Sequence, residues 1–343
     1  MFKVRKRGEQ VRRFILESIE EYPNDVVQIT SNKFNISRQA VNKHIKLLVD
    51  QGSITVKGST KSRVYSLSKQ QIKDKVYSLG DNLEEDVVWR NDIFPLLSQY
   101  PENALNIWQY CFTEMLNNAI DHSSGENVVV RVSKTAVNTN IIVYDNGEGI
   151  FKKIQRELGL LDERHAILEL SKGKVTTDPK NHTGEGIFFS SRMMDNFDIL
   201  SGGTHYSHHE REDEDWILEN QVYQSGTGIY MTLNTNTSKR LKKVFDEFTT
   251  KEDFGFSKTI VPVNLVQYGD EVLVSRSQAK RLLVRIDRFK TVILDFKDVN
   301  IIGQAFADEI FRVFKKKNPD IQIYHINANR EIEDMIVHAL FQD

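Results

Sequence analysis

The spacing of apolar and polar positions divides the chain into three parts. In the first part, residues 8–21, 26–34 and 37–52 place apolar side chains at helical intervals. SITVKG and SRVYSL then alternate as two short strands around a turn that contains Gly58. Ser37 stands where a helix N-cap belongs, and Gly52 follows the end of the third run. Residues 1–70 therefore predict three helices followed by a pair of strands.

The second and third parts follow a segment of mixed charge. Residues 71–86 carry both charge signs and few large apolar side chains, which predicts a linker. Residues 87–255 predict two helices divided at Pro101, then two alternating strands, an apolar helix and a further strand. In residues 256–343 strands alternate with helices, which is typical of a small α/β domain. The chain is thus expected to be a multidomain α+β protein.

Composition narrows the class of protein. Hydrophobic residues make up 39% and charged residues 27% of the 343 positions, as in ordinary globular proteins. No apolar run is long enough for a membrane span and the first residues lack a secretory signal, so we expect a cytoplasmic protein. Cys111 lies among apolar neighbours and is expected to fill the core rather than to react.

Charge is unevenly distributed. Residues 1–70 hold 14 Lys and Arg against 6 Asp and Glu, a net of +8, whereas the whole chain has a net charge of −2. Only the first part therefore looks suited to a polyanion. Its order of helices, turn and strand pair resembles a winged helix-turn-helix domain. The resemblance implies binding to double-stranded DNA, and a docking module with a solvated basic face is the alternative.

That resemblance assigns DNA contacts to two groups of residues. The third helix would enter the major groove, and the strand pair would hold the backbone. The helix residues are Arg38, Gln39, Asn42, Lys43 and Lys46, and the strand-pair residues are Lys57, Lys61 and Arg63.

The helix around TEMLNNAIDHS carries an unusual amount of polarity. Ala104, Ile107, Trp108, Cys111, Met115 and Ala119 make up its buried stripe. Glu114, Asn118, Asp121 and His122 lie at i, i+4, i+7 and i+8, along another face of the same helix. Taken alone, this face could simply be solvated.

Three glycine turns follow that helix in order. They are DNGEGI (145–150), HTGEGIF (182–188) and SGTG (225–228). Glycine permits tight turns and leaves room for a ligand beside the backbone, and the second turn opens a helix whose N-terminal amides would face an anion. One such turn is weak evidence for a site, but three after this helix form a pattern.

The pattern resembles the GHKL ATPase superfamily, which includes histidine kinases and anti-sigma-factor serine kinases. The resemblance runs from the helix of Glu114 to the strand after Thr227 and implies a Bergerat-type α/β sandwich that binds ATP. It assigns water activation to Glu114, Mg²⁺ coordination to Asn118, the adenine amino group to Asp145 and support of that aspartate to Thr227. The other nucleotide contacts that it implies are Asp121, His122, Gly147, Gly149, Ile150, Lys174, Thr183, Gly184, Gly186 and Ile187. One neutral asparagine is a sufficient protein anchor for Mg²⁺, which keeps water and phosphate in its shell.

The interval 162–183 is expected to be the ATP lid, with little helix or strand of its own. Lys172, Lys174 and Lys180 gather there, and Lys174 or Lys180 would touch phosphate; a mobile basic loop is the alternative. His165 lies in this interval and not on an upstream helical hairpin, so autophosphorylation on histidine is not expected.

His205, His208 and His209 lie in a polar run, residues 204–217. Metal binding is one interpretation, but an exposed hairpin connection explains the run more simply. No metal besides Mg²⁺ is expected.

The third part resembles STAS domains, and more closely a STAS-like domain of unknown function found behind GHKL domains. The resemblance rests on VILDFKDVNIIGQAFADEIFRVF. Anti-sigma-factor antagonists carry Asp-Ser at the start of the helix, whereas this chain has Gly303-Gln304, so phosphorylation there is not expected. Docking to a protein or self-association is the expected role.

Two functions therefore remain open. In one, the ATP state of the GHKL domain controls a DNA-binding regulator and ATP is hydrolysed slowly. In the other, the chain is an anti-sigma-type serine protein kinase that acts on a separate partner, for which Glu114 would serve equally well. The DNA-binding part and the missing acceptor serine favour the first.

Overall fold

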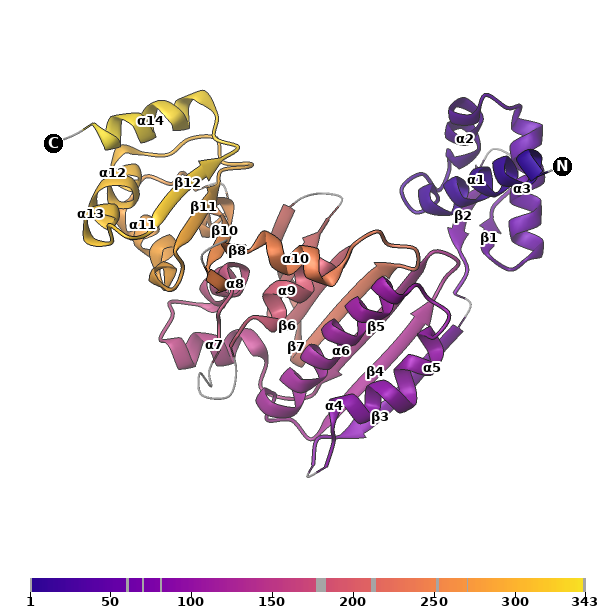
Figure 1. Cartoon of the computed structure of the whole chain (residues 1–343), viewed down its shortest axis with the longest axis horizontal. Helices are drawn as coiled ribbons and strands as arrows, with labels where there is room; N and C mark the ends of the chain where they lie inside the picture. Colours follow the sequence, from indigo (N-terminus) through magenta and orange to yellow (C-terminus); the bar gives the residue numbers. More distant parts are fainter. Residues whose placement is uncertain are drawn as a thin grey trace. The chain divides into compact units, whose positions relative to one another are not determined.

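The computed structural model describes residues 2–59, 62–69, 71–80, 82–176, 183–210, 214–250, 253–269 and 271–341. Contacts between residues divide the chain into two compact units. Unit 1 contains residues 1–75, 130–141 and 232–237, and unit 2 contains residues 76–129, 142–231 and 238–343. The chain is a mixed α+β protein (Figure 1).

Unit 1 begins with three helices and two strands. They are α1 (Phe2–Ser18), α2 (Val26–Phe34), α3 (Arg38–Asp50), β1 (Ile54–Lys57) and β2 (Val64–Leu67). The strands pair antiparallel, with Lys57 opposite Val64, and the Ser37 side chain accepts a hydrogen bond from the Ala40 amide as the α3 N-cap. These elements occur in the predicted order. Their common core consists of Val11, Ile15, Ile19, Val26, Val41, Ile45, Leu48, Ile54 and Tyr65.

The predicted linker is wrong. Residues 71–78 form strand β3 (Gln71–Ser78), which lies at one edge of a five-stranded sheet. Asp74 pairs with Arg131 of the neighbouring strand, with 2.7 Å between carboxylate oxygen and guanidinium nitrogen. Charged side chains are common on edge strands because they discourage pairing with other chains. The same charges suggested a linker in the sequence.

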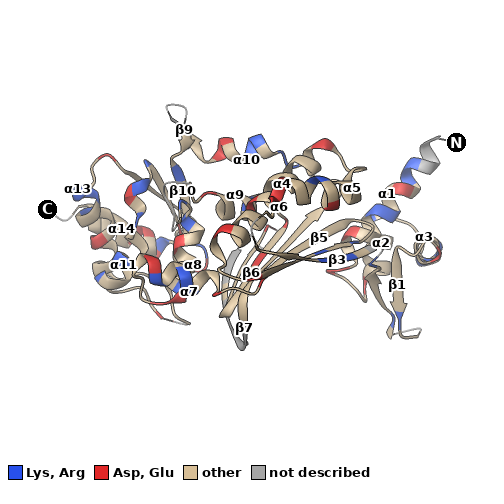
Figure 2. Ribbon diagram, turned by 90° about the horizontal axis from the view of Figure 1, so that it is seen from below, with Lys and Arg blue, Asp and Glu red and all other residues tan. Residues whose placement is uncertain are grey.

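The five-stranded sheet has the order β3-β4-β5-β7-β6. Its other strands are β4 (Asn127–Lys134), β5 (Asn138–Asp145), β6 (Asn196–His209) and β7 (Glu214–Asn234). The long helix α6 (Glu102–His122) buries the predicted apolar stripe, including Cys111. Helices on the same side as α6 are α4 (Glu85–Val88), α5 (Phe94–Leu97), α9 (Gly186–Met193) and α10 (Leu241–Glu247) (Figures 1 and 2). A π-helical turn, Trp89–Ile93, joins α4 to α5.

Within β6 the chain reverses direction. The Glu210 amide donates to the Asp195 carbonyl at 3.0 Å, although a fully extended strand between them would span about 50 Å. Gly202, with φ +60°, lies at the midpoint, as expected for a two-residue hairpin. The prediction that residue 204 begins an exposed connection is therefore wrong: residues 204–209 are strand, and Tyr206 is 1% exposed.

Residues 162–176 also differ from the prediction of a lid with little regular structure. After α7 (Ile150–Leu158), Asp162 caps helix α8 (Glu163–Lys172) by accepting a hydrogen bond from the His165 amide. All but the first two residues of α8 are buried. Burial against other elements stabilises this short helix, although its sequence has no strong helical period. Residues 177–182 lie outside the described part.

The C-terminal region contains a parallel sheet in the order β10-β11-β12. Its strands are β10 (Lys258–Pro262), β11 (Thr291–Asp295) and β12 (Gln322–Ile326), preceded by the antiparallel pair β8 (Thr249–Thr250) and β9 (Asp253–Phe256). Its helices are α11 (Arg276–Leu283), α12 (Gln304–Asp308), α13 (Lys315–Lys317) and α14 (Arg330–Leu340), with a π-helical segment Glu309–Phe314 and 3-10 turns at Val263–Val266 and Ile286–Arg288. The alternation predicted for this region is confirmed.

Two details of that region differ from the prediction. The expected strand EVLVS is reduced to one bridge between Leu273 and Ile302. The helix expected over QAKRLLVRIDR ends at Leu283, because Arg285 adopts a left-handed backbone with φ +57°.

Candidate functional site

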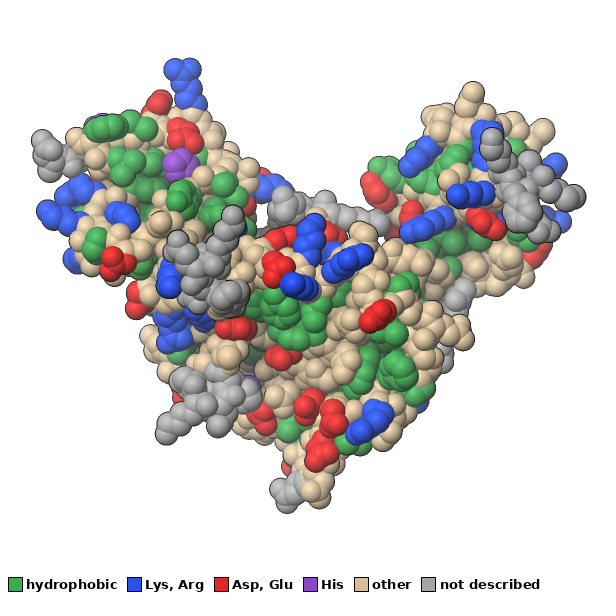
Figure 3. Space-filling view, viewed as in Figure 1, with side chains coloured by type: hydrophobic (Ala, Val, Ile, Leu, Met, Phe, Trp, Pro, Cys, Tyr) green, Lys and Arg blue, Asp and Glu red, His purple; other side chains and the backbone are tan. Residues whose placement is uncertain are grey.

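Unit 1 presents a basic, exposed surface on α3. The inward face of this helix buries Val41, Ile45 and Leu48 in the core. The five residues selected from the sequence, Arg38, Gln39, Asn42, Lys43 and Lys46, are all exposed. Lys57 and Arg63 are exposed near the connection between β1 and β2, whereas Lys61 lies outside the described residues. Figure 3 shows several basic side chains on the visible face of the three N-terminal helices.

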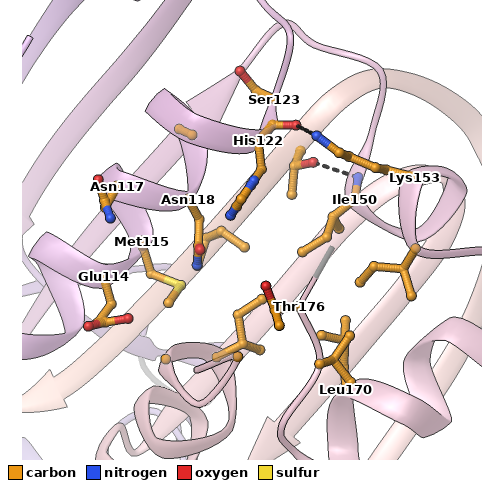
Figure 4. Close-up of a pocket in the computed structure, with 18 of the residues that line it drawn as sticks. Glu114, Met115, Asn117, Asn118, His122, Ser123, Ile150, Lys153, Leu170 and Thr176 are labelled. Atoms are coloured by element: carbon orange, nitrogen blue, oxygen red, sulfur yellow. Dashed lines mark hydrogen bonds between the residues drawn. The ribbon is translucent and has the colours of Figure 1, made fainter. Parts of the chain in front are cut away.

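Unit 2 contains a cavity of about 270 Å³ between α6, α7, α8, α9 and the sheet. Residues far apart in the sequence line it (Figure 4). The predicted residues among them are Glu114, Asn118, His122, Asp145, Gly149, Ile150, Thr183, Gly184, Gly186, Ile187 and Thr227. Such a volume is close to the lower end of the range for small-molecule sites.

Helix α6 supplies one wall of the cavity. Glu114, Asn118 and His122 follow one another at successive turns, and Figure 4 shows Asn118 and His122 extending toward the middle of the cavity. Asp121, which was predicted with them, is exposed and does not line the cavity. Its position on the helix differs by one residue from His122, which rotates the side chain by about 100°.

Asp145 lies at the end of β5 and is 5% exposed. Its Oδ1 accepts hydrogen bonds from the amides of Gly147 at 2.8 Å and Thr227 at 3.3 Å. Burial raises the pKa of this carboxyl, and the two amide donors partly offset the rise. The Thr227 hydroxyl accepts from the Ile150 amide at 2.9 Å, so the first and third glycine turns are joined at this point.

Two glycines allow close backbone approaches. A Cβ at Gly147 would lie 1.9 Å from the Ser123 carbonyl oxygen, so this residue packs under α6 and does not itself line the cavity. A Cβ at Gly186 would lie 2.1 Å from Oε2 of Glu114, so only glycine lets the start of α9 come this close to that carboxylate.

The cavity also includes residues that the sequence did not point to. Lys153 of α7 lines it, and its ammonium group donates to the His122 carbonyl at 2.7 Å, as Figure 4 shows. Glu185 lines the cavity as well. Burial raises the pKa of its carboxyl group, and the positive charge of Lys174 partly offsets that rise. In the sequence, the one signal that could have pointed to Lys153 was its position one turn into the helix that follows the first glycine turn.

The two described lysines of the expected lid lie outside the cavity lining. The Lys174 ammonium donates to the Arg288 carbonyl at 3.1 Å, so its contact here is not the expected phosphate contact. Lys172 is fully buried, with its ammonium 2.6 Å from Glu169 and 2.9 Å from the Val284 carbonyl. Burial lowers the pKa of Lys172 and raises that of Glu169, and each partner opposes the other's shift. Lys180 lies outside the described residues.

The histidines form no metal site in the described part of the chain. His205 and His209 approach the same oxygen of Asp198, at 3.0 and 3.3 Å, and Ser207 also donates to it. No group of three or more His, Cys, Asp or Glu side chains with a metal-binding arrangement occurs among the described residues. His165 is buried in the first turn of α8, so its ring is not presented at the surface.

Over the ranges that the structure describes, no helix combines the length and apolar character that crossing a membrane requires.

Comparison with known proteins gives two matches. Residues 278–333, from α11 into α14, match the STAS-like domain of unknown function (DUF4325), as expected for the C-terminal region. A second match is 33% identical over 73 residues to YuzN of Bacillus subtilis (strain 168), described as an uncharacterized HTH-type transcriptional regulator. It covers 20% of this chain and 79% of that protein. With this identity over most of the relative's length, the chain belongs, through a segment of 73 residues, to the family of HTH-type transcriptional regulators that includes YuzN.

Proposed function

We propose that this protein is a DNA-binding transcriptional regulator in which a GHKL-type domain binds Mg·ATP and controls the DNA-binding part. One observation supports the part of the proposal that concerns nucleotide binding. Glu114, Asn118, Asp145, Gly186 and Thr227 were selected from separate motifs, and all of them line one cavity.

The cavity suits an adenine ring at its inner end. The ring needs an acceptor for its amino group within an apolar slot, and Val143, Ile154 and Ile229 line the cavity with Asp145. Both described donors to Asp145 bond to Oδ1, so Oδ2 is not used by either. A carboxylate oxygen that faces an apolar slot is an acceptor suited to a ligand amino group.

The opposite end suits phosphate and Mg²⁺. Gly184, Gly186 and Ile187 line the cavity at the beginning of α9, where helix amides and the helix dipole favour an anion. Asn118 and Glu114 offer the oxygen atoms that Mg²⁺ accepts. Lys153 adds a positive charge to the cavity wall on the side of His122 and Ile150. Bound Mg²⁺ would neutralise phosphate charge, and Asn118 is the residue we assign to hold it.

The chain's own groups then have distinct tasks. Glu114 would orient a water molecule or a hydroxyl group and take its proton, because its carboxylate lies at the beginning of α9, where an anion would sit. Glu185 is a second carboxylate there, and its raised pKa makes it less able to remain charged beside phosphate. Slow hydrolysis follows from this proposal if Glu114 acts on water.

The part of the proposal that concerns DNA binding rests on helix α3 and on the similarity to YuzN. The relative's name is that of an HTH-type transcriptional regulator. In this chain a net charge of +8 over residues 1–70 accompanies an exposed row of basic and amide side chains on α3. We propose that α3 of a winged helix-turn-helix domain enters the major groove, where such side chains read base edges and hold phosphates.

The proposal is tested by titrating the purified protein with Mg·ATP and with a non-hydrolysable analogue, with and without genomic DNA fragments. We expect nucleotide to bind and to change DNA retention by about 5- to 150-fold, the usual range of coupling between sites. DNA retention that ignores a bound nucleotide would contradict the control of DNA binding by ATP. Transfer of labelled phosphate to a co-purified protein would favour the serine kinase instead.

A further inference from the structure

The segment that follows α8 lies between the cavity and the STAS-like domain. Leu170, Val175 and Thr176 line the cavity. Lys172 and Lys174, which alternate with them in the chain, bond to the segment between α11 and β11. Figure 2 shows acidic and basic positions side by side around α8. One short stretch of backbone therefore contacts both the candidate nucleotide site and the C-terminal domain.

Lys174 is held by three hydrogen bonds to two arginines. Its carbonyl accepts from the guanidinium groups of Arg285 at 2.8 Å and Arg288 at 3.1 Å, and its ammonium donates to the Arg288 carbonyl at 3.1 Å. The next residue, Val175, donates its amide to the Gly184 carbonyl at 3.1 Å. Thr176 and Thr183, the neighbours of these two residues in the chain, also line the cavity. The arginines therefore hold the backbone at Lys174, next to the cavity-lining residues Val175 and Thr176.

The junction behind Lys174 is buried and charged. The ammonium group of Lys172 bonds to Glu169 and to the Val284 carbonyl, and the Arg285 guanidinium lies 3.6 Å from the second oxygen of Glu169. Thr259 of β10 also donates its hydroxyl to the Lys172 carbonyl at 2.7 Å. Bonds shielded from water are strong and directional, so a displacement of the Arg285 segment cannot leave α8 unchanged.

The backbone on both sides of the junction is in an unfavourable conformation. Lys174 has φ +56° and Arg285 has φ +57°, in the left-handed region that residues with a Cβ seldom adopt. Such residues persist only where their surroundings hold them, and they gather at switch regions. Here the Arg285 guanidinium bonds to the Lys174 carbonyl, so each of these two backbone conformations depends on the segment that carries the other.

We propose that Arg285 and Arg288 of the STAS-like domain are positioning residues for the backbone of Lys174, Val175 and Thr176 at the edge of the candidate nucleotide pocket, so that nucleotide binding and the conformation of the STAS-like domain are coupled. This inference rests on the proposed nucleotide binding. It gives the STAS-like domain a role as an input or output of the ATP state. By linkage, a partner that holds the Arg285 segment tightens nucleotide binding by the factor by which nucleotide tightens binding of that partner.

The test combines nucleotide affinity with hydrogen exchange of the full-length protein. The affinity for a non-hydrolysable ATP analogue with Mg²⁺ is measured for the wild type, Arg285→Ala, Arg288→Ala and Arg285→Lys. Exchange is followed in residues 163–176 and 284–289, with and without the analogue. Arg276→Ala is the matched control, because Arg276 is 62% exposed and pairs with Asp308 on another part of the same domain.

We expect the analogue to slow exchange in residues 284–289 of the wild type, although these residues do not line the cavity. Arg285→Ala should weaken affinity by about 5- to 20-fold and abolish that remote protection, Arg288→Ala should have a smaller effect of the same kind, and Arg285→Lys should restore part of the affinity. Arg276→Ala should behave as the wild type.

Two results would overturn the inference in different ways. If the wild type binds the analogue and both alanine variants bind it equally well with unchanged protection at 284–289, the coupling is absent and the proposed function stands. If the wild type does not bind the analogue, the proposed nucleotide binding fails, and this inference fails with it. Because Arg288 is exposed, its alanine variant keeps the test decisive even if Arg285→Ala does not fold.

Discussion

Lysine and arginine serve opposite purposes in two regions of this molecule. On α3 they are exposed, and Lys43 and Lys46 point away from the core of unit 1. Around α8 they are enclosed: Lys172 is fully buried against Glu169, and the Arg285 guanidinium lies near the second oxygen of the same carboxylate. The same residue type therefore provides a salt-sensitive surface for a polyanion in one place and a rigid internal connection in the other. Burial, and not charge, decides between the two roles.

The largest effect is expected from Glu169→Ala. It leaves Lys172 buried without its carboxylate, which typically costs about 3–5 kcal/mol of the free energy of unfolding. Urea denaturation measures the loss. The double variant Glu169→Leu/Lys172→Met removes both charges at similar volume and should recover most of that stability. A double variant as unstable as the single one would mean that the pair itself, and not an uncompensated charge, stabilises the fold.

Acid should weaken the same region through His165. Burial, with the nearby charge of Lys172, lowers the pKa of this histidine from 6.5 to about 4; Arg281 acts in the same direction, and Asp162 opposes it. As the pH falls, the histidine of the unfolded chain takes up a proton near pH 6.5, whereas that of the folded chain does so only near pH 4. The free energy of unfolding that the neutral ring contributes is therefore complete above pH 6.5 and is lost as the pH falls toward 4. We expect a loss of about 1–3 kcal/mol over this range, after allowing for partial solvent access.

His165→Gln is the control for that pH dependence. The variant cannot titrate, so its unfolding midpoint in urea should vary less between pH 6.5 and 4 than that of the wild type. Equal slopes would exclude His165 as the source.

Asp145→Asn tests a buried charge with a role in binding. Asparagine keeps an oxygen that can accept from Gly147 and Thr227, so the fold should be preserved. If Asp145 accepts the adenine amino group, ATP affinity should fall by about 10- to 100-fold, as for a lost buried hydrogen bond. Calorimetry with ATP checks this, and unchanged affinity would exclude the assigned adenine contact.

Lys43→Ala should have the smallest effect, because the side chain is exposed. DNA affinity should fall across all sequences, and the slope of log affinity against log salt should drop by about one. Lys316→Ala on α13 removes the same charge from another exposed position and should leave that slope unchanged. A slope as steep in Lys43→Ala as in the wild type would show that Lys43 does not contact phosphate.

Local pattern was sufficient for much of the fold. The three helices of unit 1, the stripe on α6 and the alternation of strands and helices after residue 256 follow from side-chain period and caps. Prediction was wrong at β3, at α8 and in the second half of β6. An edge strand reads like a linker, a short buried helix lacks a clear period, and a Gly-Gly turn inside one polar stretch hides a hairpin.

Part of the candidate site could likewise be predicted from the sequence. Glycine turns and a helix with polar residues at successive turns are local signals. Together with the family resemblance they selected Asn118, Asp145 and Thr227, which all line the cavity. Asp121 was assigned with them but does not line the cavity, and Lys153 was missed, because neither side chain's direction can be known before the elements pack.

The sequence by itself determined where the glycine turns lie and which polar residues follow one another at successive turns of α6, since side-chain type and spacing along an element are properties of the chain. It also determined the uneven charge that distinguishes residues 1–70 from the rest. Only the tertiary structure decided the contacts of Lys172 and Lys174: Lys174 was expected to touch phosphate, but both lysines instead bond to the segment between α11 and β11 of the C-terminal domain. The direction of these lysines depends on Val284, Arg285 and Arg288, more than a hundred residues away. No local pattern encodes such a contact, because it exists only after the two segments have packed together.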